Sequence, residues 1–319
     1  MSVPSLAVIG AGHMGGLHAQ KLALLAAEGA IRFAGVCDLD PERARQVAEP
    51  LGAPLLATLA EVCEAADAGC VAVPTVLHAR IAGELLDAGL DVLVEKPLAM
   101  SREEARSLID NAEKGGRILQ VGHIERFSRA FREILPAISR PRFIEVHRIG
   151  PWSGRATDAS VILDLMIHDL DIVAQLAGRE VERAEGIGVP VLSQTEDIAN
   201  ARLNFAGGCV ANLTASRVSP ERMRKIRLFQ SDAYISIDFG TNRIVVMRRD
   251  GEIGADGVPP IRSEQLEFDE SDALLAQDRS FAEAVRTRRA PEVTGEDGYR
   301  ALDLALRIQD SIPPLGELA

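Results

Sequence analysis

Three glycines near the N-terminus constrain the fold of this chain more than any other feature. They form the pattern Gly10-Ala-Gly12-His-Met-Gly15, which directly follows the apolar run 6–9 and opens a helical stretch. Gly10 permits a tight turn, Gly12 lets the backbone approach a phosphate closely, and Gly15 lets the helix pack on the strand. The pattern predicts a strand–turn–helix unit whose helix N-terminus binds the pyrophosphate of a dinucleotide.

The first 122 residues alternate short apolar runs with helical stretches. Strands are predicted at 6–9, 32–37, 70–73, 92–94 and 117–121, and helices at 13–28, 41–49, 77–88 and 101–115. Asp40 before Pro41, and Ser101 with Glu104 three residues later, are helix-start signals. This alternation predicts a parallel sheet that is covered by helices on both faces.

The pattern changes after Gly122. An apolar helix is predicted at 160–177, extended runs at 181–190, 197–206, 208–217, 224–230, 233–239 and 243–249, a loop at 250–263, and helices at 272–289 and 295–311. The extended runs alternate and are joined by turn signals, so we expect a largely antiparallel sheet. Because 319 residues are many for one core, we predict two domains, 1–122 and 123–319.

Composition narrows the class of partner. With 35 basic and 47 acidic residues the net charge is −12, which argues against nucleic acid and against an anionic membrane surface. No apolar stretch has membrane-spanning length and no signal peptide fits the N-terminus, so we expect a soluble cytoplasmic protein. The four cysteines lack zinc spacing, so no metal site is expected; Cys37 and Cys70 lie in strand-like runs and are predicted to be buried thiols.

Asp38 bears on which dinucleotide binds. It ends the second predicted strand, where a carboxylate would bind the adenosine ribose hydroxyls and repel a 2′-phosphate, which favours NAD over NADP. Asp38 could instead cap the next helix, although Asp40 is better placed for that task. Arg43 keeps NADP open as an alternative, since an arginine near this point can accept a 2′-phosphate.

Two groups of residues are candidates for catalysis. Asp164 and His168 are four residues apart on the predicted helix, where a carboxylate could orient an imidazole that removes a hydroxyl proton. The alternative is a satisfied pair in the core. Lys96, within Glu95-Lys96-Pro97 at the end of another predicted strand, could stabilise an alkoxide, contact the cofactor ribose or be solvated. Pro97 could rigidify the turn that presents it.

Taken together, these motifs resemble the glucose–fructose oxidoreductase and inositol dehydrogenase family, Gfo/Idh/MocA. The match comprises Gly10 to Gly15 with His18, then Asp38, Pro74-Thr75 with His78, Glu95-Lys96-Pro97, and Asp164 with His168. The resemblance implies an α/β protein, with a Rossmann domain and then an α/β domain with an open, mostly antiparallel sheet through which members form homodimers or homotetramers. It implies that Lys96, Asp164 and His168 are catalytic. It also implies cofactor contacts from Gly10, Gly12, His13, Met14, Gly15, Asp38, Pro74, Thr75, His78, Glu95, Lys96 and Pro97.

A narrower likeness concerns the substrate. The stretch Gly122-His123-Ile-Glu-Arg126-Phe127, with Arg148 and Arg155, is similar to the family's UDP-N-acetylglucosamine 3-dehydrogenase branch, from which the chain departs at Ser128 and Trp152-Ser153. That branch oxidises the sugar 3-hydroxyl to a ketone, which a partner aminotransferase converts to an amine. Guanidinium groups bind diphosphates bidentately, so Arg126, Arg148 and Arg155 are candidates for substrate binding beside His123 and His168, although arginines are often solvated.

The sequence therefore predicts an NAD-dependent sugar dehydrogenase, an oxidoreductase that acts on CH–OH groups of a sugar or nucleotide sugar. The alternatives are an inositol or free-polyol dehydrogenase, a reductase of the same family, a non-catalytic NAD-binding regulator, and a structural oligomer. The basic run from Arg217 to Arg227 is interpreted as a solvated sheet face, and His147 is placed on a sheet face.

Overall fold

The computed structural model describes residues 3–152, 154, 159–178, 180–252, 259–269 and 272–313. The chain divides into two compact units. One unit consists of Met1–Phe127 and Asp272–Leu302, and the other of Ser128–Ser271 and Asp303–Ala319. The predicted division into 1–122 and 123–319 differs from this at 123–127 and at 272–302, which both belong to the first unit.

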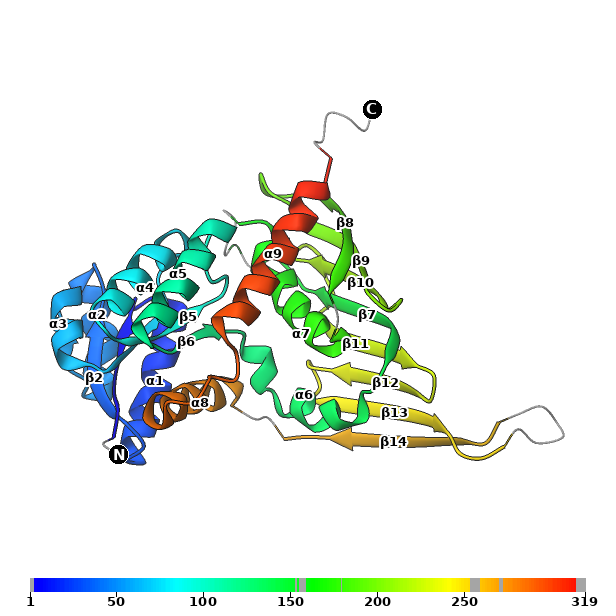
Figure 1. Ribbon diagram of the computed structural model, residues 1–319, viewed down its shortest axis with the longest axis horizontal. Helices are drawn as coiled ribbons and strands as arrows, with labels where there is room; N and C mark the ends of the chain where they lie inside the picture. Colours follow the sequence, from blue (N-terminus) through cyan, green and yellow to red (C-terminus); the bar gives the residue numbers. More distant parts are fainter. Residues whose placement is uncertain are drawn as a thin grey trace. The chain divides into compact units, whose positions relative to one another are not determined.

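The first unit is built on a six-stranded sheet in the order β3-β2-β1-β4-β5-β6 (Figure 1). Its strands are β1 (Ser5–Ile9), β2 (Arg32–Cys37), β3 (Leu55–Leu56), β4 (Ala68–Val71), β5 (Asp91–Glu95) and β6 (Leu119–Gly122). Every pair within this sheet is parallel, as the strand–helix alternation predicts. The order steps outward from β1 in both directions, so the reversal of strand order falls between β1 and β4. In open sheets of this kind, ligands bind beside that reversal, at the carboxyl ends of the strands.

Helices cover both faces of this sheet. They are α1 (His13–Ala27), α2 (Pro41–Ala48), α3 (Leu59–Ala65), α4 (His78–Asp87), α5 (Arg102–Gly115) and α8 (Ala273–Thr287). Figure 1 shows α4 and α5 side by side, while α8 packs against α1. The caps follow the sequence signals: the Asp40 carboxylate accepts two N–H groups at the start of α2, and the Ser101 hydroxyl accepts one in α5.

Helix α8 belongs to the first unit because its apolar side chains complete that unit's core. Phe281 is fully buried and lies in one cluster with Leu22 of α1 and Leu93 of β5. A backbone hydrogen bond also attaches the segment after α8 to β6: the Val121 N–H donates to the Val293 carbonyl oxygen at 3.2 Å. The return of 272–302 thus follows from burial of apolar surface that a domain of residues 1–122 alone would expose.

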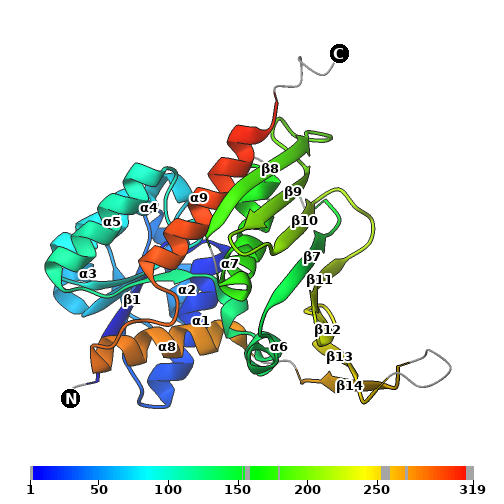
Figure 2. The same cartoon turned by 45° about the vertical axis from the view of Figure 1, so that its right-hand side comes forward.

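The second unit contains an eight-stranded sheet in the order β14-β13-β12-β11-β7-β10-β9-β8 (Figure 2). Its strands are β7 (Pro141–Ile149), β8 (Val181–Val189), β9 (Ile198–Phe205), β10 (Val210–Ser216), β11 (Met223–Gln230), β12 (Ala233–Asp238), β13 (Arg243–Arg249) and β14 (Ile261–Glu267). Strands β7 and β10 pair in parallel, and the other pairs between these strands are antiparallel. The largely antiparallel sheet is therefore confirmed. Strand β14 begins inside the predicted loop 250–263, of which 253–258 lie outside the described residues.

Helical segments accompany this sheet, besides a short 3-10 turn at Leu135–Ala137. They are α6 (Arg129–Ile134), a π-helical turn (Ile162–Met166) that continues into α7 (Ile167–Ala177), and α9 (Gly295–Ser311). The division between the two units falls within α9, between Leu302 and Asp303. The predicted helix 160–177 is thus present, but its first turn is wider than an α-helix.

Cys37 and Cys70 are buried and carry free thiols, and burial raises the pKa of each. Within the ranges that the structure describes, none of the helices combines the length and hydropathy needed to cross a membrane.

Candidate functional site

A cavity of about 740 Å³ opens beside the carboxyl ends of β1, β2, β4 and β5. All of its lining residues belong to the first unit. Those that the sequence predicted as cofactor contacts are Gly10, Gly12, Met14, Asp38, Pro74, Thr75, His78, Glu95 and Lys96. Its position at the reversal of strand order is where a dinucleotide binds in a Rossmann fold.

The glycine motif shapes one wall of this cavity. Gly10 has a φ of +97°, and a Cβ there would lie 2.6 Å from the Ala72 carbonyl oxygen. A Cβ on Gly15 would lie 1.7 Å from the Gly10 carbonyl oxygen, so only glycine lets α1 pack this closely on the turn. Gly12 lines the cavity with open space around its Cα, and no side chain caps the first turn of α1. The free N–H groups of that turn suit a pyrophosphate.

Asp38 lies at the end of β2 and lines the cavity. Its carboxylate accepts the Ala11 N–H at 2.6 Å and the Asp40 N–H at 2.8 Å, so it is held in place by the glycine turn and by the loop before α2. Asp40, and not Asp38, caps α2. The guanidinium of Arg43 lies 3.9 Å from the Asp38 carboxylate and also lines the cavity. A fixed carboxylate at this position fits ribose hydroxyls.

Replacing Asp38 by serine should weaken NAD binding by about 10-fold or more, because a hydrogen bond to a charged group contributes about 1.5–3 kcal/mol. The same change should strengthen NADP binding, since the charge that repels a 2′-phosphate is removed and Arg43 remains. Titration of each variant with both cofactors measures the ratio of their dissociation constants. Asp40→Ser, which keeps the cap of α2, is the matched control; an unchanged ratio in Asp38→Ser would contradict the assignment.

The opposite wall is formed by the segment after β4 and by the end of β5. Pro74 and Thr75 line the cavity ahead of α4. The ring nitrogens of buried His78 lie 2.8 Å from the Pro97 carbonyl oxygen and 3.0 Å from the Val73 carbonyl oxygen. His78 thus ties the two segments of this wall together, and burial lowers its pKa.

Glu95 and Lys96 end β5 at the floor of the cavity. Both line it, with Lys96 half-buried and Glu95 buried. The peptide bond between Lys96 and Pro97 is cis. A Cβ on Gly122, the last residue of β6, would lie 2.5 Å from the Glu95 carboxylate, so this glycine leaves the space that the carboxylate occupies.

His18 of α1 links Glu95 to the C-terminal part of the chain. Its Nε2 lies 3.0 Å from the Glu95 carboxylate and its Nδ1 lies 2.9 Å from the Asp278 carboxylate of α8. All three side chains are buried. Burial disfavours a charged imidazole, but the charges and hydrogen bonds of Asp278 and Glu95 outweigh it and raise the pKa of His18 to about 10. His18 is therefore an imidazolium between two carboxyl groups at neutral pH.

This imidazolium makes the stability of the fold depend on alkaline pH. The pKa of His18 rises from an ordinary 6.5 to about 10, so its contribution is complete below about pH 6.5 and is lost as the pH rises towards 10. In that window the folded chain holds a proton that the unfolded chain has released, and stability should fall by about 1.4 kcal/mol per pH unit. Urea unfolding at several pH values should show a steeper fall in wild type than in the double variant His18→Leu, Asp278→Asn. Equal slopes would contradict the charged assignment.

Asp164 and His168 belong to the second unit. Asp164 lies in the π-helical turn and His168 in the first turn of α7, and both side chains are half-buried. Their neighbours Ile162, Met166 and Ile167 are fully buried. The two polar side chains thus share the less buried side of an apolar helix, and π-helical turns are frequent at functional sites. Lys96 belongs to the first unit and these two residues to the second.

Arg148 is placed beside this helix rather than on an open surface. Its Nε and Nη2 each donate to the Asp169 carboxylate at 2.8 Å, and both residues are buried. Asp169 directly follows His168, so the ion pair fixes β7 to the helix at the candidate base. The guanidinium fork predicted to bind a diphosphate is therefore directed at a carboxylate of the protein itself.

The other predicted substrate contacts lie in different settings. His123 is buried in the turn after β6. Arg126 is buried too, and its Nη2 lies 3.4 Å from the Asp297 carboxylate within the first unit. Arg155 lies outside the described residues. His13 is exposed at the start of α1, while Met14 next to it lines the cavity.

Asp278 and Arg217 are among the buried charged residues that the sequence interpretation missed. Asp278 falls on the apolar stripe Leu274, Phe281 and Val285 of α8, and a carboxylate on such a stripe signals a buried partner. Arg217, interpreted as part of a solvated face, is only 6% exposed, whereas Arg222 and Arg224 of the same run are exposed. It continues the buried alternation Ala211, Leu213 and Ala215 of β10, which is the signal that could have identified it.

Over the described ranges, no group of three or more His, Cys, Asp or Glu side chains is arranged to hold a metal ion. Residues 5–123 match the model of an oxidoreductase family with an NAD-binding Rossmann fold, and residues 131–236 match that of the GFO/IDH/MocA C-terminal domain.

Curated relatives match this chain over nearly their whole length. UDP-N-acetylglucosamine 3-dehydrogenase from Acidithiobacillus ferrooxidans is 36% identical over 306 residues, which cover 96% of each chain. A solved structure of that protein has a TM-score of 0.91 at 35% identity and covers 98% of each chain. scyllo-Inositol 2-dehydrogenase (NAD(+)) from Bacillus subtilis is 30% identical over 328 residues, which cover 96% of this chain and 93% of that one.

The glycine turn, the strand-end carboxylate and the cavity between them are the parts of a dinucleotide site, and the relatives match nearly the whole length of the chain. The resemblance inferred from the motifs is confirmed, and the first unit is an NAD-binding Rossmann fold. The chain belongs to the GFO/IDH/MocA family of oxidoreductases.

Proposed function

We propose that this protein is an NAD-dependent dehydrogenase that oxidises the 3-hydroxyl of UDP-N-acetylglucosamine to a ketone. The observation that carries the choice of substrate is the full-length similarity to UDP-N-acetylglucosamine 3-dehydrogenase, which exceeds that to the inositol dehydrogenase. Lys96 supports a redox role for the site. It lines the cofactor cavity directly after β5 and supplies a cation there.

The residues of the first unit would hold the cofactor. The N–H groups at the start of α1 would bind the pyrophosphate, with Gly10 and Gly12 giving close access, and Asp38 would accept the ribose hydroxyls. When bound there, NAD would supply an acceptor for the hydride that leaves the sugar carbon. Lys96 would polarise the substrate oxygen and stabilise the negative charge that develops on it.

Residues of the second unit would move the proton. His168 would take the hydroxyl proton as general base, and Asp164 would hold the imidazole in the tautomer whose free nitrogen accepts that proton. The balance is complete: the alcohol loses one proton to His168 and one hydride to the cofactor, and a ketone remains. Arg126 and Arg155 are proposed near the diphosphate and His123 near the sugar, whereas Arg148 would act through its ion pair with Asp169, next to His168.

The direct test is to incubate the purified protein with NAD and UDP-N-acetylglucosamine, trap any ketone and measure its mass. The expected product has lost two hydrogens and carries the ketone at C3. scyllo-Inositol, myo-inositol and free N-acetylglucosamine form the comparison panel, and the reverse reaction is assayed with NADH and the ketone. Turnover of an inositol alone would overturn the substrate. If the protein binds NAD but turns over none of these compounds, the result would favour a non-catalytic NAD-binding regulator.

We further propose a homodimer or homotetramer and a partner aminotransferase that consumes the ketone. The second unit presents one cross-strand row of large apolar side chains, in which Phe229 and Met247 are exposed and Phe143 and Tyr234 are half-buried. An exposed apolar group of this size is typical of an interface between protein chains. Light scattering during size-exclusion chromatography measures the oligomeric state, and a monomer at micromolar concentration would contradict it.

A further inference from the structure

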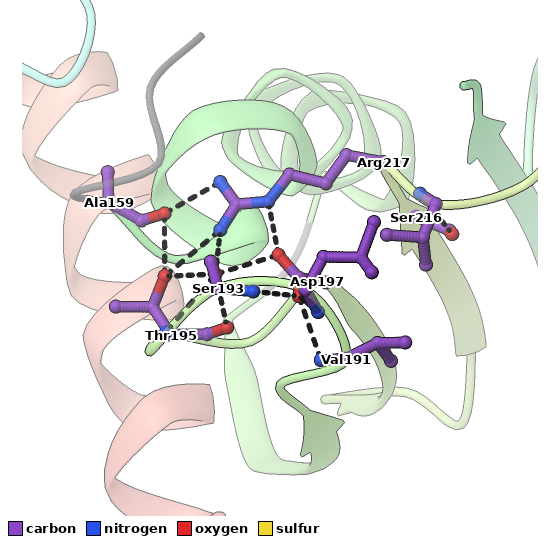
Figure 3. Close-up of polar contacts among 9 residues, drawn as sticks. Ala159, Val191, Ser193, Thr195, Asp197, Ser216 and Arg217 are labelled. Atoms are coloured by element: carbon purple, nitrogen blue, oxygen red, sulfur yellow. Dashed lines mark hydrogen bonds and ion pairs between the residues drawn. The ribbon is translucent and has the colours of Figure 1, made fainter. Parts of the chain in front are cut away.

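A buried ion pair fastens the start of the helix that carries Asp164 and His168. Arg217 directly follows β10, and Asp197 directly precedes β9. The Arg217 Nε donates to the Asp197 carboxylate at 2.7 Å, and the Arg217 N–H donates to the Asp197 carbonyl oxygen at 2.9 Å (Figure 3). The Arg217 side chain is 7% exposed and that of Asp197 is 0% exposed, so water does not compete for this pair.

Asp197 organises the loop that precedes it. One of its carboxylate oxygens accepts the N–H groups of Val191, Leu192 and Ser193 at 2.5–2.9 Å. The other accepts the Ser193 hydroxyl at 2.8 Å as well as the arginine. Burial opposes ionisation, but these donors outweigh it and hold the pKa of Asp197 well below its ordinary value. Asp197 is therefore a carboxylate throughout the working range of pH.

Arg217 connects this loop to Ala159, which precedes the π-helical turn. Its Nη1 donates to the Ala159 carbonyl oxygen at 2.8 Å, and its Nη2 donates to the hydroxyls of Ser193 and Thr195 at 2.9 and 3.0 Å. The Thr195 hydroxyl donates to the same Ala159 oxygen at 3.0 Å. Figure 3 shows the guanidinium between Ala159 on one side and Asp197 on the other. One planar group thus joins three segments of the chain.

From Ala159 the attachment continues into the π-helical turn. The Val161 N–H donates to the Glu196 carbonyl oxygen at 2.9 Å, next to Asp197. The Ser160 carbonyl oxygen accepts the Asp164 N–H at 2.9 Å, and the Ser160 hydroxyl accepts the Gln309 side chain at 2.9 Å. Two hydrogen-bonded steps therefore lead from the arginine to the backbone of Asp164.

We infer that Arg217 and Asp197 are positioning residues for the reaction, which set where the backbone of Asp164 and His168 lies. The inference rests on the proposed function. Neither residue needs to touch substrate, because the guanidinium acts through Ala159 and Thr195. A displacement of about 1 Å in a reacting group can lower a rate about 100-fold, so loss of this attachment has a catalytic effect larger than its local extent. Lysine cannot replace the arginine, since a single ammonium lacks the planar fork that reaches four acceptors, on Asp197, Ala159, Ser193 and Thr195.

The test compares Arg217→Lys, Thr195→Val and the control Arg227→Lys with wild type. Arg227 lies on β11 of the same sheet and pairs with Glu145 at 2.7 Å, but this pair is about one-third exposed. We expect Arg217→Lys to lower kcat for UDP-N-acetylglucosamine about 10–100-fold, with the dissociation constant for NADH within about twofold of wild type. Thr195→Val should act in the same direction but less strongly, and Arg227→Lys should match wild type.

Two readouts separate positioning from support of the fold. Hydrogen exchange at the amides of 161–168 should speed up in Arg217→Lys, and this is measured whether or not turnover occurs. Trp152, the single tryptophan of the chain, has its ring centroid 5.6 Å from the Arg217 guanidinium, so its fluorescence reports the ion pair directly. In Arg217→Ala, added guanidinium ion at non-denaturing concentration should restore part of kcat together with the fluorescence of wild type.

The outcomes are distinct. Turnover of wild type with an equal kcat in Arg217→Lys would overturn the positioning role and leave the proposed function standing. Absence of turnover in wild type would overturn the proposed function, and unchanged hydrogen exchange at 161–168 would then overturn the structural half of the inference as well. If Arg217→Ala does not fold, Arg217→Lys and Thr195→Val carry the test, because each keeps most of the buried side chain.

Discussion

Replacing His168 by alanine should lower the turnover number about 10²–10⁴-fold, which is the usual contribution of a general base. Its affinity for NAD should stay near that of wild type, because the cofactor cavity is lined by the first unit alone. Stopped-flow or mass-spectrometric measurement of ketone formation gives the rate, and a titration with NAD gives the affinity.

The matched control for this variant is Gln175→Ala, since Gln175 is exposed on the same helix. It should leave both quantities unchanged. If His168→Ala turns over substrate at the rate of wild type, the assignment of His168 as the general base is wrong. Loss of NAD affinity in His168→Ala would indicate a damaged fold instead of a missing proton acceptor.

The second large effect concerns the buried charges around His18. Replacing His18 by leucine should destabilise the protein by about 3–5 kcal/mol, because it leaves the carboxyl groups of Asp278 and Glu95 buried without their cation. Adding Asp278→Asn to this variant should recover part of the loss, since it removes one of the uncompensated groups. The two changes are thus expected to be non-additive.

Urea unfolding followed by circular dichroism measures these differences. Lys21→Met, which removes a partly exposed ion pair with Asp272 near the same helix, is the control and should cost about 1 kcal/mol or less. A double variant less stable than His18→Leu would show that Asp278 has no charge to be compensated, and a loss below 1 kcal/mol in His18→Leu would contradict the buried ion cluster.

The cofactor half of the molecule was predictable because its signals are local. Gly10, Gly12 and Gly15 mark one turn between a strand and a helix, and Asp38 ends the next strand, so a stretch shorter than forty residues determines that geometry. The predicted strands and helices of this part differ from the structure mainly at β3 and α3. Strand β3 has only two residues, which is too short for any periodic signal.

The second unit was less predictable because charged side chains interrupt its apolar patterns. The bounds of strand β7 were not predicted, although His147 was placed on a sheet face and Ile144 and Val146 are buried, since Arg142, Glu145 and Arg148 stand among them. It lies at the centre of the sheet, between β11 and β10, where Arg148 is buried by its pair with Asp169.

Pairs that are distant in the sequence set the limit of prediction for the site. His18 and Asp278 are 260 residues apart, and no local pattern states that they meet. Arg217 and Asp197 meet only because β9 and β10 pair in a register that places one beside the other. Both contacts follow from tertiary packing, which decides which charges are buried together.

The return of α8 to the first unit has a consequence for folding during translation. Strands β1 to β6 are complete once Gly122 has been synthesised. The core side chains of Phe281 and Val285, and the Asp278 carboxylate that faces His18, follow more than 150 residues later in the sequence. The apolar face that α8 covers in the folded protein, and the side chain of His18, therefore stay exposed to solvent while the whole sheet of the second unit is synthesised. The core of the first unit closes only after residues 272–302 have been synthesised.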